Sequence, residues 1–99
     1  MTTRDRPQGW QLAECLLPGL TQPRAEELAQ RVSAELLGRP HRGVCFLGSL
    51  LMPGDEVLLC LFSGAAEDVR VVSERAGLPF ERILACVGIG WPTAAGDLR

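Results

Sequence analysis

The sequence has 99 residues and a formal net charge of −2. A chain of this length builds one core, so we expect a single domain over residues 1–99, with an ordered core of about residues 10–92. Its ten basic residues are scattered, whereas a nucleic-acid partner requires a clustered basic face, so no nucleic-acid partner is expected.

We expect neither a secretory signal nor a membrane span. Polar residues follow Met1 as far as Pro7, and the apolar stretch 44–62 is interrupted at 53–56. The four cysteines are Cys15, Cys45, Cys60 and Cys86. Their spacing lacks a C-x-x-C pair, so we predict reduced, buried thiols in a cytoplasmic protein with no membrane partner. Two disulfides are the alternative.

The first two elements are predicted to be a strand and a helix. The strand covers Trp10 to Leu17 and is closed by Pro18-Gly19. The helix covers Pro23 to Leu37, since proline suits a first helical turn and Gly38 followed by Pro40 ends the segment. Its apolar residues recur at helical spacing, at Ala25, Leu28, Ala29, Val32 and Leu36.

The second half of the chain predicts a hairpin, a helix and a last strand. Two apolar runs, Gly43 to Met52 and Val57 to Ser63, flank a turn at 53–56. The helix covers Glu67 to Ala76, and Gly77 takes the left-handed position that ends it. The last strand covers Ile83 to Trp91. This order predicts an α+β, ferredoxin-like βαββαβ fold, a four-stranded antiparallel sheet with two helices on one face.

Alternation in the hairpin predicts a second apolar face. Leu58, Cys60 and Phe62 face one side of the sheet, and Val57, Leu59 and Leu61 face the other. In the preceding strand we assign Cys45 to the helix-covered side and Phe46 to the opposite side with Leu50. Because two short helices cover only one face, the other is expected to meet a second subunit or an apolar molecule. We predict a homodimer through Phe46, Leu50, Leu59 and Leu61.

Several short motifs occur between Glu14 and Pro92. They are Glu14 with Leu17-Pro18-Gly19, Pro23 with Glu26-Glu27, Ser49, Cys60, and Ala76-Gly77-Leu78-Pro79 with Arg82-Ile83. In these the chain resembles a family of small ferredoxin-like proteins of largely unknown function that includes nickel-binding members. The resemblance implies the same fold and a dimer of the α/β-barrel type, formed across the sheets.

One departure from that family concerns metal binding. The resembled family tends to carry a histidine before the hairpin serine and an aromatic residue after it, whereas this chain has Gly48 and Leu50. Nickel and zinc require imidazole, thiolate or carboxylate groups that converge on one point. We therefore predict no metal site and no cofactor. Nickel is implied by the resemblance alone. Gly48 leaves either a hollow in the apolar face or a β-bulge.

Two residues are candidates for acid–base chemistry. Glu14 lies in the middle of an apolar strand, where burial raises the pKa of a carboxyl group toward a usable range. The alternative is an ion pair with Arg42 or Arg82. His41 lies in a loop between Arg39 and Arg42. It is either a proton carrier or a solvated surface residue.

The expected function is the binding of a largely apolar small molecule on the open sheet face. The expected lining consists of Trp10, Leu12, Glu14, Phe46, Gly48, Leu50, Leu59 and Trp91. One alternative is a cofactor-independent isomerase, cyclase or lyase that uses Glu14 as acid or base, and a second is a nickel-binding protein of the resembled family.

Overall fold

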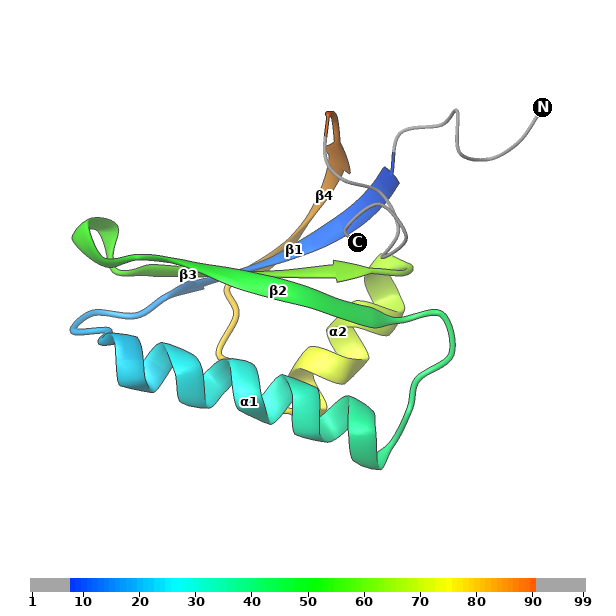
Figure 1. The fold of residues 1–99 in the computed structure, drawn as a ribbon, viewed down its shortest axis with the longest axis horizontal. Coiled ribbons are helices and arrows are strands. Elements are labelled where there is room, and N and C mark those ends of the chain that lie inside the picture. Colours follow the sequence, from blue (N-terminus) through cyan, green and yellow to red (C-terminus); the bar gives the residue numbers. More distant parts are fainter. Residues whose placement is uncertain (1–7, 91–99) are drawn as a thin grey trace.

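The computed structural model describes residues 8–90, which form one sheet and two helices (Figure 1). The elements are β1 (Gln8–Leu16), α1 (Gln22–Gly38), β2 (Cys45–Met52), the short 3-10 helix η2 (Pro53–Asp55), β3 (Val57–Ser63), α2 (Ala66–Arg75) and β4 (Arg82–Gly88). The strands are antiparallel in the order β2-β3-β1-β4, and both helices lie on the same side of the sheet. The predicted ferredoxin-like α+β fold is confirmed.

Local sequence explains where the helices begin and end. Thr21 caps α1, because its Oγ1 accepts a hydrogen bond from the backbone N–H of Arg24, and Pro23 occupies the first turn. After α2, Gly77 has a φ of 73°, and its N–H donates to the carbonyl of Glu74.

Within residues 8–90, no helix is long and apolar enough to cross a lipid bilayer.

The core lies between the helices and one face of the sheet. Its largest fully buried side chains include Phe62, Leu28, Leu58, Val32 and Val69, which come from β3, α1 and α2. Burial of a side chain of this size contributes about 1.5–3 kcal/mol to folding. The predicted alternation of β3 is therefore correct, since Leu58, Cys60 and Phe62 face the helices.

A β-bulge in β2 reverses part of the predicted alternation. Phe46 pairs with Phe62 and Gly48 pairs with Leu61, so Leu47 is an extra residue between them. Phe46 consequently packs against the core, with its ring centroid 5.2 Å from that of Phe62, and its assignment to the open face was wrong. Cys45 is exposed, although it was predicted to be buried beneath the helices.

Gly48 makes this bulge possible. Its φ is 135°, a conformation that residues with a side chain rarely adopt, although a Cβ at Gly48 would meet no atom within 4 Å. The requirement for glycine is therefore conformational rather than steric.

Gly48→Ala should accordingly destabilise the fold through backbone strain. We expect a loss of about 1–2 kcal/mol in the free energy of unfolding, measured by urea denaturation. Gly54→Ala is the matched control, because its Cβ would also meet no atom within 4 Å and its φ is not positive. Equal stability of the two variants would contradict this explanation of the bulge.

Candidate functional site

The sheet face that the helices leave uncovered, here called the open face, carries most of the exposed apolar side chains of the strands. Leu50 is 61% exposed, and Leu47, Leu16 and Met52 are also exposed. Contiguous apolar surface of this kind marks interaction or ligand-binding sites in proteins. The open face is therefore the candidate site.

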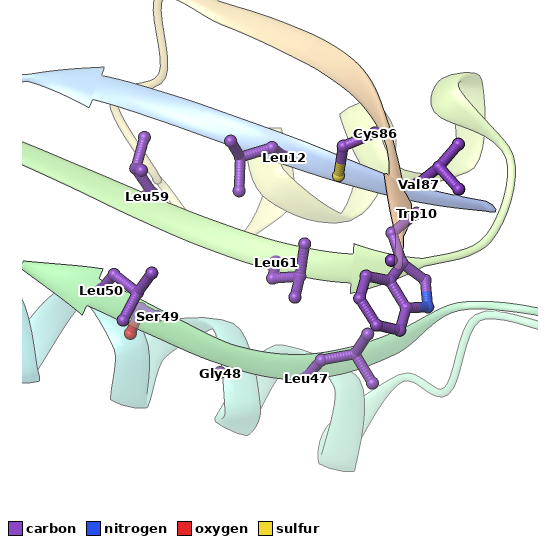
Figure 2. A pocket seen from close by; sticks show the side chains of 11 residues that line it. Trp10, Leu12, Leu47, Gly48, Ser49, Leu50, Leu59, Leu61, Cys86 and Val87 are labelled. Atoms are coloured by element: carbon purple, nitrogen blue, oxygen red, sulfur yellow. The ribbon is translucent and has the colours of Figure 1, made fainter. Parts of the chain in front are cut away.

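A hollow of about 340 Å³ lies on the open face and extends across all four strands (Figure 2). Its lining residues are Trp10, Leu12, Leu47, Gly48, Ser49, Leu50, Leu59, Leu61, Cys86, Val87 and Gly88. This volume is at the lower end of the range of about 300–1,000 Å³ found for ligand pockets. Among residues 8–90, no charged side chain lines the hollow.

Two glycines and a tryptophan shape one end of the hollow. The indole of Trp10 lies directly against Gly88, since a Cβ on this glycine would stand 2.6 Å from the Cζ3 atom of the ring. Trp10 is thereby held nearly buried, close to Leu47 in Figure 2. Gly48 on the edge strand β2 presents no side chain opposite Leu61, which leaves space on this side of the face.

Three of the lining residues carry a polar side-chain group, which are the indole N–H of Trp10, the hydroxyl of Ser49 and the thiol of Cys86. Burial raises the pKa of the Cys86 thiol, so this group is protonated and uncharged at neutral pH. Ser49 lies on the edge strand β2 opposite the buried Cys60, so its side chain is on the helix-covered side of the sheet. None of the three groups presents a charge to a ligand.

Glu14 forms an ion pair and does not line the hollow. Its Oε1 accepts a hydrogen bond of 2.6 Å from Nε of Arg82, which lies directly opposite on β4. The bond and the negative charge of Glu14 raise the pKa of Arg82. The structure thus shows the ion pair with Arg82 that was the alternative to the acid–base role. Glu14 lies beside the lining residue Leu59 but does not itself line the hollow.

Three further predicted positions lie elsewhere. His41 approaches Asp68, with 3.1 Å between Nε2 and Oδ1, and so connects the loop before β2 to α2, away from the hollow. Phe46 faces the core, as described above. Trp91 lies outside the described residues.

Sequence reasoning placed Trp10, Leu12, Gly48, Leu50 and Leu59 in the site, and the structure brings these five together. The lining residues that it missed are Leu47, Ser49, Leu61, Cys86, Val87 and Gly88, although Leu61 was predicted on the same face. Alternation along β2 places Leu47 on the helix-covered side with Cys45, but the bulge turns its side chain to the open face. Alternation along β4 was the signal for Cys86.

The remaining cysteines are free thiols. Cys15 and Cys60 are fully buried, and the hydrogen bond with Cys15, together with burial, raises the pKa of Cys60. Their burial agrees with the prediction for small apolar side chains.

The order of the elements and the antiparallel sheet define the class of ferredoxin-like α+β proteins. The chain matches no protein-family model and no curated protein. Its fold is similar to the crystal structure of SCO4226 from Streptomyces coelicolor A3(2), with 25% sequence identity and a TM-score of 0.64. The alignment covers 76% of this chain and 91% of that one, and it supports the fold.

The donor groups do not fit a nickel or zinc ion. Within residues 8–90, no three His, Cys, Asp or Glu side chains lie close enough together to hold a metal. The Nε2 atom of His41 is 3.1 Å from Oδ1 of Asp68. These residues supply no set of converging ligands.

We therefore predict that folding requires no metal. Treatment with a strong chelator, followed by addition of nickel or zinc, should leave the melting temperature unchanged in differential scanning calorimetry. A large loss of stability after chelation that nickel restores would contradict this prediction.

Proposed function

We propose that this protein binds a largely apolar small molecule in the hollow of the open face, as a homodimer in which the same face of a second copy covers the ligand. The observation that supports the proposal most strongly is the hollow itself, which combines a pocket-like volume with a lining of leucine, valine, tryptophan and glycine. Transfer of an apolar ligand from water to such a surface is favourable.

The second copy is proposed because of the exposed apolar side chains around the hollow. Leu16, Leu47, Leu50 and Met52 stand on the open face, and the helices pack on the other side. A sheet with one wet face normally alternates apolar and polar residues, which these strands do not. A two-fold contact between open faces would bury these side chains and enclose both hollows.

An acid–base enzyme is a weaker candidate. The carboxylate of Glu14 is occupied by Arg82 and lies outside the lining, and His41 is on another part of the surface. A general acid or base must be within hydrogen-bond reach of the reacting group. We therefore propose a binding protein rather than a catalyst that uses either residue.

The proposed dimer is tested by a charge placed on the open face. We expect wild-type protein to sediment as a dimer at micromolar concentration and Leu59→Glu to sediment as a monomer. The reason is that an unpartnered charge buried in an interface costs several kcal/mol. Leu50→Glu repeats the test at a position that is more exposed within one chain and therefore less important for its folding.

Leu37→Glu is the control for these variants, since this leucine of α1 is 85% exposed and lies away from the open face. It should remain dimeric. A monomeric wild-type protein, or dissociation of all three variants alike, would argue against a dimer through the open face.

Ligand binding is tested with the uncharged fluorescent probe N-phenyl-naphthylamine. We expect saturable binding to wild-type protein, and a loss of affinity of about tenfold or more in Leu61→Trp, because the larger ring fills the hollow. Leu37→Trp adds the same side chain outside the hollow and should bind as wild-type does. Absence of binding to wild-type protein, or equal binding to both variants, would contradict the proposed site.

A further inference from the structure

The four strands contain only two charged residues within the part of the chain that the structure describes. These are Glu14 on β1 and Arg82 on β4, and they pair with each other at 2.6 Å. The Glu14 side chain is 18% exposed and that of Arg82 is 63% exposed. The sheet therefore presents one positive and one negative charge, held together, and no net charge.

This ion pair borders the hollow. Glu14 lies directly opposite Arg82 on one side and Leu59 on the other, and Leu59 lies opposite Leu50. Residues opposite each other on neighbouring strands share a face of the sheet. Since Leu59 and Leu50 line the hollow, the pair continues the same row of side chains at its margin.

The lining itself offers no partner for a charged ligand. The described lining residues that carry a polar side-chain group are Trp10, Ser49 and Cys86, and all three groups are uncharged. A charge that enters such a surface loses hydration without gaining an opposite charge. Arg82 is the one cation of the described strands, it lies in the same row of side chains as Leu59 and Leu50, and Glu14 already pairs with it.

We infer that the ligand of the proposed site is uncharged, and that Glu14 acts as a specificity-determining residue because it neutralises Arg82 at the margin of the hollow. This inference rests on the proposed function. It also gives Glu14 a role that differs from acid–base chemistry: the carboxylate keeps anions out by removing the charge that would attract them.

The shape of the hollow agrees with this ligand class. Its lining extends from β2 to β4, and three inter-strand spacings of about 4.8 Å each correspond to a span of roughly 14 Å. A hollow of about 340 Å³ with this span fits an elongated molecule that lies across the strands. Two or three fused or linked rings would contact the leucines of β1, β2 and β3, and Trp10 of the inner strand β1 would lie beside them.

The test compares two probes that share an aromatic skeleton and differ by one negative charge. N-phenyl-naphthylamine is neutral, and anilinonaphthalene sulfonate carries a sulfonate. Titration of wild-type protein with each should give an affinity about tenfold or more in favour of the neutral probe. In Glu14→Gln the released Arg82 charge should reduce this preference severalfold.

Two further variants make the comparison specific. Arg82→Gln leaves the carboxylate unpaired, so it should increase the preference for the neutral probe. Glu74→Gln makes the same change in net charge as Glu14→Gln, but at an exposed position of α2, and its preference should equal that of wild-type protein. Circular dichroism and thermal melting confirm that each variant is folded before titration.

The outcomes separate this inference from the proposed function. Equal affinity of wild-type protein for both probes, or an unchanged preference in Glu14→Gln, would overturn the role of Glu14 while the hollow remains a binding site. If neither probe binds, the proposed function fails and this inference fails with it.

Discussion

The whole arrangement depends on one constraint: two helices can cover only one face of a four-stranded sheet. The helix-covered face buries Phe62, Leu58 and Cys60 against α1 and α2 and forms the core. The other face is built from leucines as well, so its side chains meet water unless something packs on them. The hollow, the exposed leucines around it and the single ion pair of the strands all lie on this uncovered side.

The order of the elements could be predicted from the sequence because turn chemistry and apolar periodicity agree along the chain. Pro53-Gly54 separates two apolar runs, and Gly77 ends α2 with the expected left-handed backbone. The faces of β3 were also predictable, since strict alternation holds there. Here local preferences and the global fold point the same way.

Other parts of the site depend on which residues of neighbouring strands lie opposite each other, and a single sequence does not reveal this register. Gly48 could mark a hollow or a bulge, and it does both: the bulge turns Phe46 inward and Leu47 outward, while the missing side chain opens the face. The sequence left two possible ion-pair partners for Glu14, which were Arg42 and Arg82. It is decided by the register of β1 and β4, which places Arg82 directly opposite.

The bulge also has a consequence for how β2 finds its partner during folding. Leucine-rich strands with apolar side chains on both faces have little in their composition to distinguish one register from a slipped one. In this pair, a shift of β2 by one residue that kept the bulge opposite Phe62 and Leu61 would place Leu47 or Ser49, rather than Gly48, in a backbone conformation that strongly disfavours a side chain. One glycine thus makes these slipped pairings costly and favours the observed alignment of the hairpin.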